Sequence, residues 1–217
     1  MATTSHLLAM LLLVLLQTGE TGEAPSSPAH VHIRHVLTAV NGPRGGVGFL
    51  TILEEEAQIA RRHAELAASD LANLEAMQTH MKHVRHAIDP STEEKGPGRG
   101  FGVLRAASSV ETHILLAAKS EGKTDNIERH ATHVATSARN VVTWSEAILA
   151  ESEEVLKAET AEAAAPAVQK IAELTGFIVE GHDSDSDGQV SWQEGEGGVA
   201  QVRQHAELLA KGEGIAD

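Results

Sequence analysis

Apolar side chains recur at helical spacing along most of this chain, and this periodicity limits the fold more than any other feature of the sequence. Residues such as Ile52, Ile59 and Leu66 share one helical face, and no stretch shows the alternation of a half-buried strand. The composition is rich in alanine, with three Phe, two Trp and no Tyr, which favours helices over sheet. We therefore expect an all-α fold. The expected helices span residues 28–40, 50–69, 71–88 (capped by Asp70), 103–119 and 125–163, and a sixth begins with Pro166.

Histidine follows a repeated pattern in this sequence. The chain has 13 His, and the motif His-x-x-His-Val occurs three times, 48 and 50 residues apart. Two single histidines, 50 residues apart, lie between these motifs, and a glycine-rich loop and a Phe precede each of them. An internal duplication with a period of about 50 residues is the simplest explanation, so we expect a duplicated, His-rich helical bundle over residues 28–163. The repeated histidines are His32, His35, His63, His80, His83, His113, His130 and His133.

The two histidines of each His-x-x-His motif lie on the same face of a helix and can share a metal ion. Imidazole suits zinc, copper, nickel and iron, and helical bundles commonly hold such sites in their cores. Haem held between two histidines is an alternative, and hydrogen-bonded or solvent-exposed structural histidines are another. By nearness along the chain we expect two clusters, and we assign no role to His6, His86, His182 and His205. One expected cluster joins His32, His35, His63, His80 and His83, and the other joins His80, His83, His113, His130 and His133.

An acidic segment near the C-terminus has the spacing of a calcium loop. Aspartates stand at positions one, three and five of this segment, Gly188 at six and a glutamate at twelve. Calcium takes six to eight oxygen ligands, and the glycine permits the sharp bend that brings them together. The expected ligands are Asp183, Asp185, Asp187, Gln189 through its backbone carbonyl, Ser191 and Glu194.

This spacing resembles the loop of the EF-hand calcium-binding family. The resemblance implies a helix–loop–helix over residues 166–211, with an exit helix that begins near Glu194. Gly195, Gly197 and Gly198 are poor helix formers, so we expect this exit helix to be weak or kinked. EF-hands usually pair, yet the sequence has no second loop of this kind. A single hand packed on the bundle, a homodimer through the hand, or docking of a protein partner are the alternatives.

The N-terminus has the features of an export signal. An unbroken apolar run of ten residues extends from Leu7 to Leu16, which fits the core of a signal peptide and is short for a membrane span. We expect a signal peptide over residues 1–24, with cleavage after residue 24 or 29, and a periplasmic or secreted protein. A short membrane anchor is the alternative.

Charge and missing motifs narrow the function further. The formal net charge of −14 disfavours nucleic acid and anionic membrane surfaces as partners and favours cations. There is no cysteine, no His-Glu-x-x-His, no Glu-x-x-His and no Gly-x-Ser-x-Gly, which disfavours the common metalloprotease, di-iron and hydrolase sites. We therefore expect a metal-binding protein more than an enzyme. A metalloenzyme or redox protein that uses the same histidines, and a calcium-ordered interaction module, are the alternatives.

Overall fold

The computed structural model describes residues 27–38 and 46–215, and these residues form an all-α fold without strands. The expected signal peptide lies outside the described residues. None of the helices in the described part of the chain is both long enough and apolar enough to cross a membrane. The helices are α1 (Pro28–Leu37), α2 (Phe49–Ala68), α3 (Leu74–Ile88), α4 (Val103–Ala117), α5 (Asp125–Lys157), α6 (Ala161–Glu180) and α7 (Val199–Glu213).

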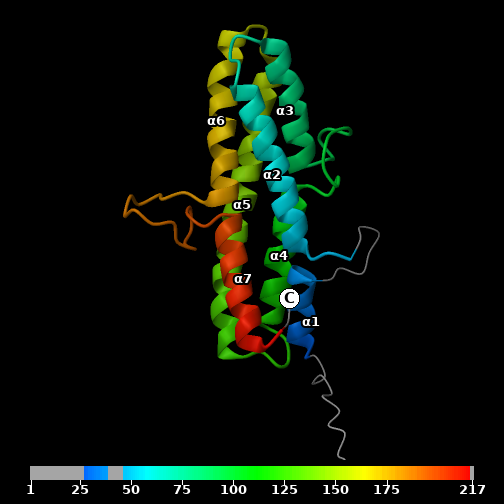
Figure 1. Ribbon diagram of the computed structural model, residues 1–217, viewed down its shortest axis with the longest axis vertical. Helices are drawn as coiled ribbons and strands as arrows, with labels where there is room; N and C mark the ends of the chain where they lie inside the picture. Colours follow the sequence, from blue (N-terminus) through cyan, green and yellow to red (C-terminus); the bar gives the residue numbers. More distant parts are fainter. Residues whose placement is uncertain (1–26, 39–45, 216–217) are drawn as a thin grey trace, which may run out of the picture.

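The helices are arranged as an elongated up-down-up-down bundle of four columns (Figure 1). The first column rises through α1 and α2, the second descends through α3 and α4, and the fourth descends through α6 and α7. Only the third column is a single helix, α5, whose 33 residues extend over about 50 Å. Helix α5 therefore packs against helices from both halves of the bundle. Loops interrupt the second and fourth columns near mid-height, and the first column is divided between α1 and α2.

Polar side chains set the starts of several helices. The side chains of Ser27, Asn73, Thr124 and Thr160 each accept a hydrogen bond from a backbone N–H of the first helical turn. The structure corrects three of the expected boundaries. Helix α5 ends at Lys157, with Ala158 as its C-cap, and does not continue to residue 163. The cap of α3 is Asn73 and not Asp70, which instead accepts from the Ala72 N–H in the preceding turn. Helix α6 begins at Ala161, because Thr160 caps it there, and Pro166 lies inside the helix.

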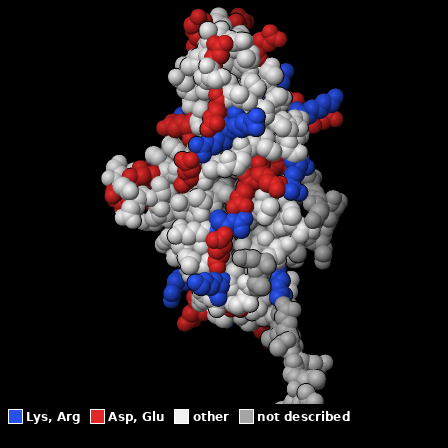
Figure 2. All heavy atoms as spheres, viewed as in Figure 1, with Lys and Arg blue, Asp and Glu red and all other residues white. Residues whose placement is uncertain are grey.

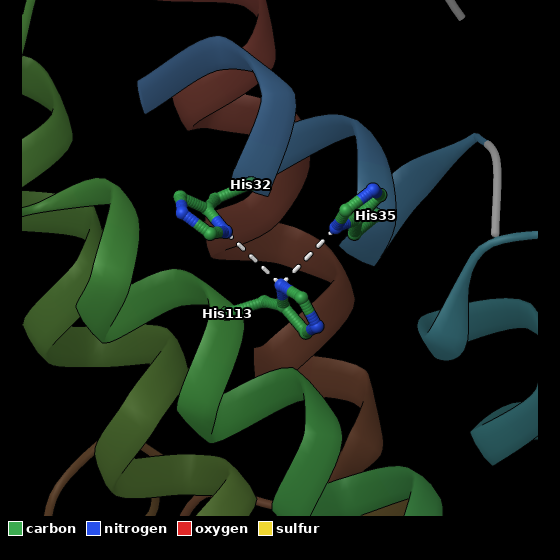
Figure 3. A group of neighbouring side chains, drawn as sticks. All are labelled: His32, His35 and His113. Carbon is green, nitrogen blue, oxygen red and sulfur yellow. Dashed lines mark hydrogen bonds between the residues drawn. The ribbon is translucent and has the colours of Figure 1, made fainter. Parts of the chain in front are cut away.

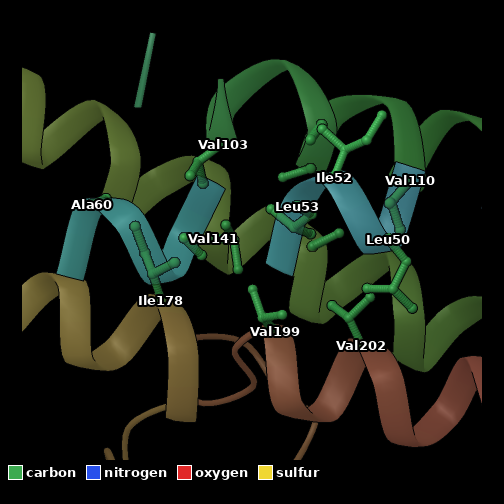
Figure 4. Packing of buried hydrophobic residues seen from close by; sticks show 14 of the residues in the cluster. Leu50, Ile52, Leu53, Ala60, Val103, Val110, Val141, Ile178, Val199 and Val202 are labelled. Carbon is green, nitrogen blue, oxygen red and sulfur yellow. The ribbon is translucent and has the colours of Figure 1, made fainter. Parts of the chain in front are cut away.

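One hydrophobic core runs through the whole bundle. Figure 4 shows its middle, where side chains from α2, α4, α5, α6 and α7 meet. Buried alanines such as Ala57 and Ala60 on α2 allow helices to approach closely, and β-branched and leucine side chains fill the remaining space. Helices α6 and α7, which the sequence suggested as a helix–loop–helix, pack into this same core.

A buried carboxylate fixes the loop that interrupts the second column. Glu56 on α2 is fully buried, and its Oε1 atom accepts hydrogen bonds from the backbone N–H groups of Arg99, Phe101 and Gly102. Gly98 passes so close that a Cβ atom there would lie 2.3 Å from Glu56 Oε2. Gly98 also has a φ of +119°, which residues with a Cβ rarely adopt, so both its conformation and this close approach favour glycine in the loop.

Charged side chains of both signs are interspersed on the face shown in Figure 2, and acidic side chains gather at the upper end of the bundle and on the loop between α6 and α7. Several of the charges form ion pairs, including Arg203 with Glu54 and Arg61 with Glu180. This face has no continuous basic patch.

Candidate metal centres

Nine histidines of the described chain form three separate groups, each able to hold a metal ion. Each group combines the two histidines of one His-x-x-His motif with a single histidine from another helix, and all nine side chains are half-buried. We call these groups the first triad (His32, His35 and His113), the second triad (His63, His80 and His83) and the third triad (His130, His133 and His205).

The first triad joins α1 to α4. His32 and His35 project from consecutive turns of α1 toward His113 on α4 (Figure 3). The Nδ1 atom of His113 lies 3.1 Å from Nδ1 of His32 and 3.2 Å from Nδ1 of His35. One ring nitrogen is thus the meeting point of three imidazoles.

The other two triads repeat this geometry. In the second, Nδ1 of His63 on α2 lies 3.1 Å from Nδ1 of His80 and 3.3 Å from Nδ1 of His83, both on α3. In the third, Nδ1 of His205 on α7 lies 3.3 Å from Nδ1 of each α5 histidine. In all three triads, the Nδ1 atom of the single histidine lies near the Nδ1 atoms of both histidines of the motif.

These separations match the ligand shell of a single metal ion. Histidine nitrogens bound to tetrahedral zinc lie about 2.0–2.1 Å from the metal, which places them about 3.3 Å from one another. Hydrogen bonding accounts for the arrangement less well. A neutral ring nitrogen carries either one proton or one lone pair, so Nδ1 of His113 cannot make two ordinary hydrogen bonds at once. A metal ion would satisfy all three lone pairs.

The triads favour neutral imidazole, the form that binds metal. Burial and the neighbouring imidazoles lower the pKa of His63 to about 4, with a further effect of Arg62. Burial and the same kind of neighbours lower the pKa of His205 to about 4 as well. Burial is also the largest cause of the lowered pKa of His32, His83, His113, His130 and His133. These side chains therefore offer lone pairs at neutral pH.

The positions of the triads follow from the order of the columns. Each His-x-x-His motif lies near the start of a column and each single histidine near the end of one, so antiparallel neighbours bring the two together. The first two columns exchange ligands reciprocally, because α1 pairs with α4 and α3 with α2. The third and fourth columns form one triad between α5 and α7. The upper part of α5 packs against α6, and no histidine lies in either segment.

All eight histidines proposed from the sequence belong to triads, but in different groups from those expected. The expected clusters placed His113 with His130 and His133, whereas the structure places it with His32 and His35. The expected clusters followed nearness along the chain, and the antiparallel packing of the columns overrides it.

His205 had no assigned role and completes the third triad. A signal for it exists in the sequence. His205-Ala-Glu-Leu repeats His63-Ala-Glu-Leu, and the two leucines, Leu66 and Leu208, are both exposed. His86 is buried and belongs to no triad. Its Nδ1 atom lies 2.8 Å from the carbonyl oxygen of Glu93.

The acidic segment forms an exposed turn between α6 and α7. Asp183, Asp185 and Asp187 each place an oxygen within 4.8 Å of the other two. Their carboxylates accept hydrogen bonds from backbone N–H groups of the same turn, including that of Gly188. Glu194, the expected closing ligand, is not part of this group.

The exit helix begins later than expected, at Val199 of α7 instead of near Glu194. Glycines disfavour a helix between these positions, and other contacts hold the backbone in an irregular path. Glu196 is buried and accepts hydrogen bonds from the Ser191 N–H and the Ser184 hydroxyl. These bonds close the turn on itself.

Within residues 27–38 and 46–215, no protein group forms a hydrogen bond with the distal nitrogen, Nε2, of a triad histidine. Among the described residues, the bonds of these side chains run between Nδ1 atoms only, and their Nε2 atoms have no partner. Metal-bound histidines usually donate this second N–H to a carboxylate or carbonyl, which raises their affinity. Protein groups in the described part of the chain do not supply that bond, which leaves it to water.

Known proteins do not identify the chain: no family model, no curated protein and no solved structure matches it.

Proposed function

We propose that this protein binds transition-metal ions, one in each of its three histidine triads. The single observation that carries the proposal is that, at three separate places in one chain, the Nδ1 atom of one histidine lies 3.1–3.3 Å from the Nδ1 atoms of two others, with all three ligand atoms within 4.8 Å of one another. One such group has many explanations, but the recurrence of the same geometry between different helix pairs favours a common ligand.

The donor set favours zinc, copper, cobalt or nickel. Three neutral imidazoles suit these borderline metals, whereas calcium and magnesium require oxygen ligands. The geometry favours a single ion over haem. Two imidazoles that bind haem lie on opposite faces of the ring, with their nitrogens about 4 Å apart and the macrocycle between them. The three converging nitrogens of a triad leave no slot for a macrocycle.

Reversible binding, as in a metal buffer or carrier, fits the sites better than a permanently bound ion. Each triad supplies three protein ligands and is half-buried, so water or another donor can occupy a fourth position. A metalloenzyme would use the same open position and would need, in addition, a side chain placed as a general base. Binding is therefore our conclusion, and catalysis is the second reading.

Cobalt provides a direct test, because tetrahedral Co²⁺ absorbs strongly in the visible range. We expect three equivalents of Co²⁺ to bind, and one fewer for each of His63→Ala, His113→Ala and His205→Ala. The matched control is His182→Ala, since His182 stacks on Phe177 and belongs to no triad. Absence of the visible bands in the wild-type protein, together with no shift of melting by Zn²⁺ or Cu²⁺, would refute the proposal.

A second candidate function is calcium binding at the acidic turn. The observation that favours it is the approach of the Asp183, Asp185 and Asp187 carboxylates, whose mutual repulsion a divalent cation would relieve. The resemblance to the EF-hand loop supports the same proposal, with Gln189, Ser191 and Glu194 as further ligands after a rearrangement of the loop. Calorimetric titration of the wild type, Asp185→Asn and Glu194→Ala tests it. No heat of Ca²⁺ binding to the wild type would rule calcium out. If Asp185→Asn lost Ca²⁺ binding but Glu194→Ala kept it, the EF-hand arrangement would be excluded.

Export is also part of the proposal, because the first 24 residues have the pattern of a signal peptide. Determination of the N-terminal sequence of the mature protein tests it. A start after residue 24 or 29 supports export, and an intact N-terminus on protein recovered from the cytoplasm contradicts it.

A further inference from the structure

The indole of Trp192 lies flat against one imidazole of the third triad. Its ring centroid is 4.0 Å from that of His133, and the two planes differ by 17°. Trp192 belongs to the loop between α6 and α7, whereas His133 lies on α5. A loop that carries no triad histidine therefore contacts the proposed metal site.

The same helix holds this loop in place. The Asn140 side chain on α5 donates to the carbonyl oxygens of Gln193 and Gly197, at 2.8 and 3.1 Å. It also accepts from the Gly195 N–H at 2.9 Å. Asn140 is two helical turns beyond His133, so the backbone after Trp192 and the imidazole under it are fixed to one rigid element.

The other two triads have less aromatic support. In the first, the ring of Phe49 stacks on His113 with a centroid distance of 5.3 Å and an angle of 26°. In the second, none of the aromatic side chains in the described part of the chain stacks on His63, His80 or His83. Three sites with the same ligand set therefore differ in what lies against their rings.

A stacked ring strengthens a metal site in two ways. It restricts rotation of the imidazole before binding, which reduces the conformational entropy that is lost when the metal binds. Metal coordination also draws electron density from the imidazole, and a partly cationic ring is attracted to an aromatic face, most strongly to that of tryptophan. Both effects favour the metal-bound state.

We propose that Trp192 is a positioning residue that makes the third triad the tightest of the three sites, so that metal ions fill the third triad first, the first triad next and the second triad last. This inference rests on the proposed function. It assigns to the loop a role that does not require calcium.

Proteins with one triad each provide the test. His63→Ala with His113→Ala leaves only the third triad, His63→Ala with His205→Ala only the first, and His113→Ala with His205→Ala only the second. Competition with a chromophoric chelator gives the Kd of each for Co²⁺. We expect the Kd to rise in the proposed order, by about tenfold between the third and second triads. Equal values, or a different order, would overturn the inference.

The role of the indole is tested in the protein that keeps only the third triad. Trp192→Leu should weaken Co²⁺ binding about tenfold, and Trp192→Phe should recover part of the loss, because it restores an aromatic face. Trp144→Leu is the control, since Trp144 packs against Phe177 and not against a triad. An unchanged Kd for Trp192→Leu would show that the stack has no such role.

A fluorescence titration keeps the inference testable if the double variants fold poorly. In Trp144→Phe, which retains all three triads, Trp192 is the only indole, and nearby Co²⁺ quenches it. With an affinity about tenfold above that of the second triad, quenching should pass its midpoint by the first of three equivalents and run ahead of the visible bands, which continue to grow to the third. Quenching spread evenly over three equivalents would refute the order of filling and leave the proposed function standing, whereas absence of the bands would refute the proposed function itself.

Discussion

The carboxylate of Glu56 accepts a hydrogen bond from the backbone N–H of Phe101 at 3.0 Å, and this contact ties α2 to the loop that splits the second column. The same oxygen accepts from the N–H groups of Arg99 and Gly102. A fully buried carboxylate thus replaces the backbone acceptors that a continuous helix would supply. These hydrogen bonds hold the loop in a defined position against α2.

Removal of this carboxylate should destabilise the protein. Glu56→Ala leaves buried N–H groups without an acceptor, each of which costs about 1–3 kcal/mol, so we expect a loss of about 3 kcal/mol in the free energy of unfolding. Urea denaturation measures it. The control is Glu55→Ala, which removes a more exposed partner of Arg99 and should cost less than about 1 kcal/mol. Similar losses in the two variants would contradict the role given to Glu56.

The metal-free protein should lose stability when the pH falls from about 7.5 to 5. In the unfolded chain histidine takes up a proton with a pKa near 6.5, whereas the pKa of His63 and of His205 is about 4 in the folded protein. The unfolded state therefore binds more protons throughout this window, and acid favours unfolding. Urea midpoints at pH 7.5, 6 and 5 measure the effect. His63→Gln with His205→Gln should flatten the profile, and an equally steep decline in that variant would assign it to other groups.

The sequence was sufficient for the fold class and for most of the triad histidines, because both depend on local spacing. The three-residue step of His-x-x-His places two imidazoles on one face wherever the helix lies. The choice of the third histidine is not local. His113 meets His35, which is 78 residues away, because the second column runs antiparallel to the first. Only the order of the columns determines that pairing.

The boundaries near α6 and α7 show a second limit of sequence patterns. Pro166 marks a preferred first turn, but the Thr160 hydroxyl caps the helix one and a half turns earlier. The loop after α6 resembles an EF-hand, yet its exit helix does not begin near Glu194. Contacts from α5, chiefly those of Asn140, hold the backbone there, and these tertiary contacts leave no periodic trace in the sequence.

Substitution of His113 distinguishes the two ways of grouping the histidines. His113→Ala should abolish metal binding at His32 and His35 and leave His130 and His133 unaffected. The imidazole NMR signals of the wild type and the variant, recorded during a Zn²⁺ titration, measure this. If the signals of His130 and His133 also stopped responding to Zn²⁺ in the variant, the clusters expected from nearness along the chain would be favoured over the observed triads.

Asn140→Ala should release the loop between α6 and α7. The variant loses three hydrogen bonds to the loop backbone, so we expect about 2 kcal/mol less stability, redder emission from Trp192, and faster proteolysis within residues 181–198. Gln193→Ala is the matched control. Asn140 binds the backbone carbonyl of Gln193 and not its exposed side chain, so this substitution should leave the loop in place. Equal proteolysis of Asn140→Ala and the control would show that α5 does not hold the loop, and the stacking of Trp192 on His133 would then need another cause.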